Sequence, residues 1–267
     1  KLIEDKKVDG PRLLAAGIGM KGSHGAGHIG MPHCGAGEIR HTCRENLKKG
    51  ADLLKLFITP GVPEPASTFV PSFLSLEEIS TAVSEGARLG IPTAAHCIGG
   101  QGLKDCIDGG VDVIEHMYMA AEQDVERLAA SRCVVDLTSG IFLDPSREEF
   151  LSPANALKVR LNRSRVRENV ARIIKARLPF VLGTDAYHGF LYREVGYAVE
   201  LGADPVTAIQ GVTSRAARVC RLEDRIGKLE NGMEADIIAV EGNPLEDVSR
   251  LSQVGLVMKG GGVYRQP

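Results

Sequence analysis

Four residues with side chains suited to metal binding or proton transfer lie within or at the ends of short apolar runs of this 267-residue chain. Lys55 lies inside Leu-Leu-Lys-Leu-Phe-Ile, and His96 follows Thr-Ala-Ala. His116 follows Val-Ile-Glu, and Asp185 follows Leu-Gly-Thr. A buried ammonium group is costly unless it is paired or neutralised, and imidazole and carboxylate groups are common zinc ligands. These residue types therefore indicate a metal site.

Each of these residues also has an ordinary structural explanation when it is taken alone. A histidine at the end of a strand is commonly a hydrogen-bonded core or rim residue, and an aspartate after Gly-Thr commonly caps a turn. Lys55 can extend its ammonium group to the edge of the fold. One shared metal site explains all four residues together, because they lie on four strands near the same end, and we favour that interpretation.

Apolar runs alternate with helical stretches through most of the chain. We expect strands at 12–17, 52–59, 92–98, 111–117, 134–138 and 180–185, and long helices at 76–89, 122–131 and 156–178. Ser75 and Glu78 have the spacing of a capping box. The alternation predicts β-α-β units and a parallel sheet of an α/β fold, in which functional residues lie at the carboxyl ends of the strands.

The pattern changes after the last of these strands. Two helices are expected at 194–201 and 205–220, followed by short apolar runs that turn residues such as Asn231-Gly232 join. We therefore divide the chain into a barrel domain over residues 1–222 and a small β appendage over residues 223–267.

Composition excludes several classes of protein and of partner. The chain is 43% hydrophobic and 25% charged with a net charge of −2, which excludes a disordered chain and gives no reason to expect a nucleic-acid or membrane partner. No apolar run approaches the length of a membrane span. The six cysteines form no C-x-x-C pair, and we interpret them as reduced thiols of a cytoplasmic protein.

Longer motifs surround the four candidate residues. They include Gly50-Ala-Asp-Leu-Leu-Lys55, Gly110-Val-Asp-Val-Ile-Glu-His116, Leu182-Gly-Thr-Asp185 and Arg225-Ile-Gly-Lys-Leu-Glu-Asn-Gly-Met-Glu-Ala-Asp236. With these motifs the sequence resembles the amidohydrolase superfamily, in particular its imidazolonepropionase and Xaa-Pro dipeptidase (prolidase-like) branch. The resemblance runs from about Gly10 to the end of the chain.

The resemblance implies a TIM-type (β/α)8 barrel with a small β-sandwich, and one or two divalent metals, usually zinc. It implies that Lys55 is carboxylated and bridges the metals, and that His96 and His116 bind one of them. Asp185 would bind the other metal and act as general base and acid while a metal-bound hydroxide attacks an amide carbonyl. The implied substrates are small molecules, either dipeptides or N-acyl amino acids.

Three further residues are candidates for substrate binding. In the dipeptidase branch, residues placed like Tyr118 and His188 contact the substrate, although plain rim packing is the alternative for both. His24 belongs to a Gly-rich loop that we expect over the barrel mouth, where the loop either contacts substrate or is simply mobile. For Arg193 we favour a surface ion pair over a contact with a substrate carboxylate.

One motif of the family has no counterpart here. The family's His-x-His pair ends the first barrel strand, whereas His24 and His28 are four positions apart, and we count six of eight strands. We therefore expect this chain to be the later part of a longer protein, with strands three to eight. The alternatives are a cyclic amide hydrolase of the imidazolonepropionase type and a non-catalytic barrel remnant that lacks strand one. Exposed helices on an outer ring also lead us to expect a homo-oligomer.

Overall fold

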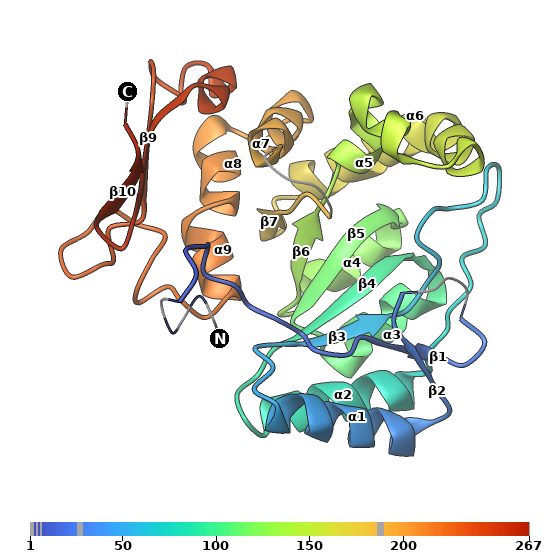
Figure 1. Ribbon diagram of the computed structural model, residues 1–267. Coiled ribbons are helices and arrows are strands. Elements are labelled where there is room, and N and C mark those ends of the chain that lie inside the picture. Colours follow the sequence, from blue (N-terminus) through green and yellow to red (C-terminus); the bar gives the residue numbers. More distant parts are fainter. Residues whose placement is uncertain (1–2, 4, 6, 26–28, 186–189, 267) are drawn as a thin grey trace.

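The computed structural model describes residues 3, 5, 7–25, 29–185 and 190–266 (Figure 1). Its main layer is a seven-stranded sheet in the order β2-β1-β3-β4-β5-β6-β7, in which every neighbouring pair is parallel. The strands are β1 Met20–Gly22, β2 Met31–His33, β3 Leu54–Phe57, β4 Thr93–Gly99, β5 Val113–Met119, β6 Val134–Leu137 and β7 Phe180–Leu182. The predicted parallel α/β architecture of the barrel type is confirmed.

From β2 to β7, helices connect successive strands of the sheet. The described helices are α1 Ala36–Lys48, α2 Leu76–Ala87, α3 Gly100–Gly109, α4 Glu122–Ala129, α5 Gly140–Leu143, α6 Pro153–Lys175, α7 Leu191–Glu200, α8 Pro205–Gly211 and α9 Ser214–Val219, with the 3-10 helices η1 Pro145–Phe150 and η2 Val248–Ser252. Figure 1 shows α1 and α2 packed side by side along one side of the sheet. The predicted capping box of α2 is present, because the Ser75 hydroxyl accepts the Glu78 N–H and the Glu78 carboxylate accepts the Ser75 N–H.

The core is aliphatic and lies between the sheet and its helices. On β3, Leu54 and Leu56 are fully buried, whereas Lys55 and Phe57 are only half-buried. Side chains of a strand alternate between the two faces of the sheet. The leucines therefore point to the helix-covered face, and Lys55 points to the opposite face.

The C-terminal region forms a second, antiparallel sheet in the order β10-β9-β8, with β8 Ile237–Val240, β9 Val254–Lys259 and β10 Gly262–Arg265. Figure 1 shows it beside α8 and α9, near the N-terminal segment. Arg12 of that segment donates to Asp236 at 2.8 Å and pairs with Glu234. The predicted boundary between residues 222 and 223 stays a prediction.

Two predicted elements are wrong. Residues 12–17 form no strand, because the backbone there bonds to a loop: the Ala15 N–H donates to the Asp52 carboxylate at 2.8 Å, and the Asp52 N–H donates to the Ala15 carbonyl. The sheet instead gains β1 and β2 from the Gly-rich segment. The expected helix at 205–220 is broken into α8 and α9 at Thr213, whose φ of −129° and ψ of −101° lie outside helical values.

No helix in the described part of the chain has both the length and the apolar character needed to cross a membrane.

Candidate metal centre

Polar side chains of four neighbouring strands share one face of the sheet. The register pairs Phe57 with His96, His96 with Glu115, and Glu115 with Asp136. Lys55 lies two residues before Phe57 and therefore faces the same side. The alternation of the strands thus gathers an ammonium group, an imidazole and two carboxylates on the face that the helices leave open.

His116 approaches this group because β5 departs from regular strand geometry. The φ angles of His116 and Met117 are 77° and 54°, which non-glycine residues adopt rarely and at a cost of about 1–3 kcal/mol each. The rings of His96 and His116 lie 4.6 Å apart at an angle of 60°. Strained backbone of this kind concentrates at functional sites, and here it brings the two imidazoles together.

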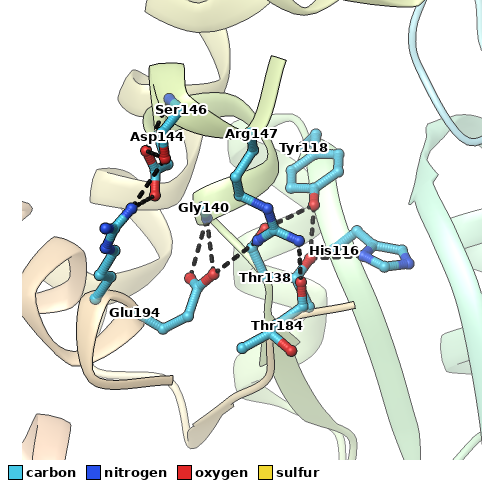
Figure 2. A network of polar contacts seen from close by, with 10 residues as sticks. His116, Tyr118, Thr138, Gly140, Asp144, Ser146, Arg147, Thr184 and Glu194 are labelled. Carbon is cyan, nitrogen blue, oxygen red and sulfur yellow. Dashed lines mark hydrogen bonds and ion pairs between the residues drawn. The ribbon is translucent and has the colours of Figure 1, made fainter. Parts of the chain in front are cut away.

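The hydrogen bonds of His116 determine which ring nitrogen carries the proton. The Tyr118 hydroxyl donates its proton to the Thr138 carbonyl at 2.9 Å (Figure 2). In the 2.6 Å hydrogen bond between the Tyr118 and Thr138 hydroxyls, Thr138 is therefore the donor. The Thr138 hydroxyl oxygen then accepts from His116 Nδ1 at 2.8 Å. Because burial lowers the pKa of His116 well below its usual value, the ring is neutral. Its Nε2 therefore holds an uncommitted lone pair.

His96 has the complementary arrangement. Its Nε2 lies 3.1 Å from the Pro60 carbonyl, which can only accept, so Nε2 carries the proton and Nδ1 holds the lone pair. Burial lowers the pKa of His96 to about 4, against the raising effect of that carbonyl, and the positive charge of Lys55 lowers it further. Both imidazoles are thus neutral near pH 7, which is the form that binds metals.

Lys55 forms an ion pair with Glu115, and the two side chains are 19% and 17% exposed. Burial lowers the pKa of Lys55 to about 8, and the negative charges of Asp185 and Asp136 oppose that shift. A lysine with such a pKa is half neutral at pH 8, compared with less than about 1% for an ordinary lysine. The neutral amine is the form that can be carboxylated.

Asp136 carries a further carboxylate of the cluster. Its Oδ1 is buried and has no hydrogen-bond partner among the described residues. Burial raises its pKa to about 7, and the charges of Lys55 and Asp185 act on it in opposite directions. Gly183 makes room for it, since a Cβ there would lie 3.0 Å from both carboxylate oxygens. A buried carboxylate without a partner is costly and calls for a cation.

Asp185 follows β7 and is the last described residue before residue 190. Its φ of 48° places it in the left-handed region. The residue as a whole is exposed, but its carboxyl group loses part of its hydration, which raises its pKa, whereas the positive charges of Lys55 and Arg147 lower it. The charges of Lys55 and Asp185 each favour the ionised form of the other group.

The three predicted substrate contacts lie in different surroundings. Tyr118 is 1% exposed, and its hydroxyl is occupied by Thr138. His24 is exposed, with its ring edge-on to Phe73 at 5.9 Å and its Nε2 3.4 Å from the Ser72 carbonyl. His188 lies outside the described residues. Their roles toward substrate stay predictions.

The profile of the amidohydrolase family matches residues 2–263. The chain belongs to the amidohydrolase family. Ochratoxinase of Aspergillus niger is 30% identical over 308 aligned positions, which cover 100% of this chain and 63% of that protein. The chain thus spans less than two thirds of this relative. The ochratoxinase crystal structure superposes with a TM-score of 0.82, covering 100% of this chain and 69% of that chain.

Two further amidohydrolases are similar. A Xaa-Pro dipeptidase, whose crystal structure has methionine bound in the active site, is 29% identical with a TM-score of 0.86, covering 99% of this chain and 70% of that chain. Imidazolonepropionase of Desulfotalea psychrophila is 23% identical over 179 residues, which cover 63% of this chain and 38% of that protein. Both enzymes named in the predicted resemblance are therefore among the relatives.

Members of the amidohydrolase family are generally metal-dependent, and the donor chemistry of this site fits a divalent cation. Two neutral imidazoles each offer one lone pair, and the orphaned Asp136 oxygen lies on the same face. Among the described residues, no group of three or more His, Cys, Asp or Glu side chains is arranged to bind a metal ion. Lysine lies outside those four residue types, so Lys55 would contribute in addition to them.

Sequence reasoning did not single out Glu115 or Asp136 as site residues. The signal that identifies them is the alternation of β5 and β6, which places both on the face of Lys55. A cavity of about 440 Å³ lies elsewhere, at the amino ends of the strands, where it is lined by residues such as Pro92, Asp112 and Pro179. It is separate from the candidate metal centre, because in a barrel of this type the chemistry lies at the carboxyl ends.

Proposed function

We propose that this amidohydrolase hydrolyses an amide bond of a dipeptide or an N-acyl amino acid at the centre formed by Lys55, His96, His116 and Asp185. The observation that carries the proposal is the pairing of two neutral imidazoles, each with one nitrogen committed to a protein oxygen and one lone pair uncommitted. Histidine ligands of metals are usually held by such a hydrogen bond from the other ring nitrogen.

The chain's own residues would hold one or two zinc ions. His96 Nδ1 and His116 Nε2 offer the lone pairs, and Lys55, carboxylated on its neutral amine, and Asp185 offer oxygens. When bound, the metal supplies a Lewis acid for the amide carbonyl and lowers the pKa of water.

Asp185 is the proton carrier in this proposal. Its carboxylate accepts a proton from the attacking water while the new C–O bond forms, and it delivers that proton to the leaving nitrogen as the C–N bond breaks. Burial raises the pKa of Asp185 toward the working range of such a group. The positive charge of Arg147 acts against this shift and lowers the pKa of the carboxyl group.

The relatives support the substrate class. The similar Xaa-Pro dipeptidase has a dipeptide substrate by its name, and its crystal structure has methionine bound in its active site. The match to imidazolonepropionase favours a cyclic amide as the second candidate substrate. The third hypothesis is a barrel remnant without activity. It predicts that neither dipeptides or N-acyl amino acids nor cyclic amides are hydrolysed.

The same proposal includes the remaining expectations. Tyr118, His188 and His24 would contact a small-molecule substrate, and the protein would be a cytoplasmic homo-oligomer without nucleic-acid or membrane partners. These statements rest on the sequence motifs and on the family.

The test is a substrate screen combined with metal analysis. The zinc-loaded protein is assayed against Xaa-Pro and other dipeptides, N-acyl amino acids and cyclic amides, and its metal content is measured by mass spectrometry. D185N should lose at least about 100-fold in kcat, whereas D108N, an exposed aspartate paired with Arg127, should match the wild type. Hydrolysis of cyclic amides alone would select the second candidate, and no hydrolysis by zinc-loaded protein would refute both.

A further inference from the structure

A buried arginine outside the candidate metal centre bonds to the backbone that leads into Asp185. Arg147 lies in η1 and is only 7% exposed. Its Nη2 donates to the carbonyl of Thr184 at 2.8 Å, and its Nη1 lies 3.6 Å from Oε1 of Glu194 (Figure 2). One guanidinium group therefore contacts the chain on both sides of Asp185.

Glu194 is fixed by the backbone of the same region. It is 2% exposed near the start of α7, and both of its carboxylate oxygens accept the Gly140 N–H at 3.0 Å. A Cβ at Gly140 would lie 2.4 Å from Glu194 Oε1 and 3.0 Å from Arg147 Nη1. The close approach of these three groups therefore requires glycine at position 140.

A buried ion pair is a weak source of stability, because the loss of hydration offsets most of the attraction between the charges. Stability alone thus gives little reason for this arrangement. What the pair does is geometric: it fixes the Thr184 carbonyl, and with it the planar peptide group that enters the left-handed backbone of Asp185.

We propose that Arg147, which pairs with Glu194, is a positioning residue that orients Asp185 for proton transfer. The inference rests on the proposed function. It concerns a residue that contributes no lone pair to the metal and whose hydrogen bond toward Asp185, among the described residues, is the one to the Thr184 carbonyl.

The neighbouring residue on α7 provides a matched control. Arg193 forms an ion pair with Asp144 and donates to the Ser146 hydroxyl at 2.9 Å. The sequence predicts a surface ion pair for Arg193, but its partner is buried and does not lie on the surface. Its partners Asp144 and Ser146 lie in the segment between β6 and α6 that also contains Arg147, at the N-cap and the start of η1. No hydrogen bond of Arg193 among the described residues reaches Thr184 or Asp185.

The decisive variant is R147K, which keeps the charge but replaces the planar fork by a single ammonium group that cannot serve Thr184 and Glu194 in the same geometry. We expect kcat to fall about 10- to 100-fold, as for a displaced catalytic group, with KM within about 3-fold and zinc content unchanged. R193K should keep the kcat of the wild type. Should R147K fail to fold, E194A, which removes the acceptor of the Gly140 N–H and the partner of Arg147 Nη1, replaces it with the same expectation.

A second readout is independent of turnover. Hydrogen exchange of peptides covering residues 183–185 should accelerate in R147K and in G140A but not in R193K. If the wild type hydrolyses none of the substrates, the proposed function fails while the exchange data still decide whether Arg147 holds this segment. Wild-type exchange and wild-type kcat in R147K would overturn the inference, as would an equal loss of kcat in R147K and R193K.

Discussion

Replacement of Thr138 by valine tests the assignment of the proton on His116. The change keeps the shape of the side chain and removes one oxygen, which lies 2.8 Å from His116 Nδ1 and 2.6 Å from the Tyr118 hydroxyl. Tyr118 keeps its bond to the Thr138 carbonyl, but the His116 N–H is left without an acceptor in a side chain that is 3% exposed. An orphaned buried donor costs about 1–3 kcal/mol.

The same loss affects the metal. A hydrogen bond to the distal nitrogen of a ligating histidine sets its orientation and tautomer, and its removal typically lowers metal affinity about 10- to 100-fold. T138V should therefore lower the free energy of unfolding of metal-free protein by about 1–3 kcal/mol and weaken zinc binding in a competition titration with a chelator.

T138S, which keeps the hydroxyl, is the control and should bind zinc like the wild type. Urea denaturation supplies the free energies, with an unchanged m-value showing that the comparison is valid. Zinc affinity in T138V equal to that of T138S would refute the proposed tautomer and the role of His116 as an Nε2 ligand.

Three further predictions concern the same cluster. K55A should lose zinc and activity together, and short-chain carboxylic acids should partly restore both. Metal analysis and an activity assay of the variant measure these losses. Full activity in K55A would count against a carbamate on Lys55. Because the pKa of His96 is about 4 in the folded state and about 6.5 in an unfolded chain, the unfolded state binds the extra proton between these values. The free energy of unfolding of the wild type should therefore fall as the pH decreases from 6.5 to 4, by up to about 3 kcal/mol relative to H96Q. Urea denaturation of both proteins across this pH range measures the difference. If the His96 ring were solvated, the two proteins would show the same pH dependence. G183A should destabilise the protein by about 1–3 kcal/mol, since its Cβ would lie 3.0 Å from both oxygens of Asp136. In urea denaturation, the double variant G183A/D136A should recover most of that loss.

Local sequence patterns predict the sheet well from β3 to β7. Leu54 and Leu56 alternate with Lys55, and this pattern both predicts β3 and places the lysine on the open face. Ser75 and Glu78 identify the start of α2, because a capping box depends only on residues three positions apart. Features that depend on short-range chemistry are therefore readable from the sequence.

Other features depend on groups that are distant along the chain. The segment at 12–17 has the apolar composition of a strand, but Asp52 and the acidic residues before β8 hold it as irregular chain. The left-handed backbone at His116 has no sequence signature, since the residue there is not glycine. That Glu115 and Asp136 lie on the same face of the sheet as Lys55 can be inferred only when the register of β4, β5 and β6 is known.

The segment between β6 and α6 carries none of the predicted metal ligands, yet it contacts the surroundings of two of them. Thr138, at its start, accepts from His116, and Arg147, further along, holds the peptide that leads to Asp185. Phe142 of α5 lies between these two residues in the sequence, is fully buried, and contacts the Tyr118 ring with 4.5 Å between centroids. Because interiors are close-packed, a shift of α5 cannot leave both ends of the segment in place. One loop of the barrel thus links the orientation of a metal-binding imidazole to that of the proton carrier, while the ligands themselves lie on other strands.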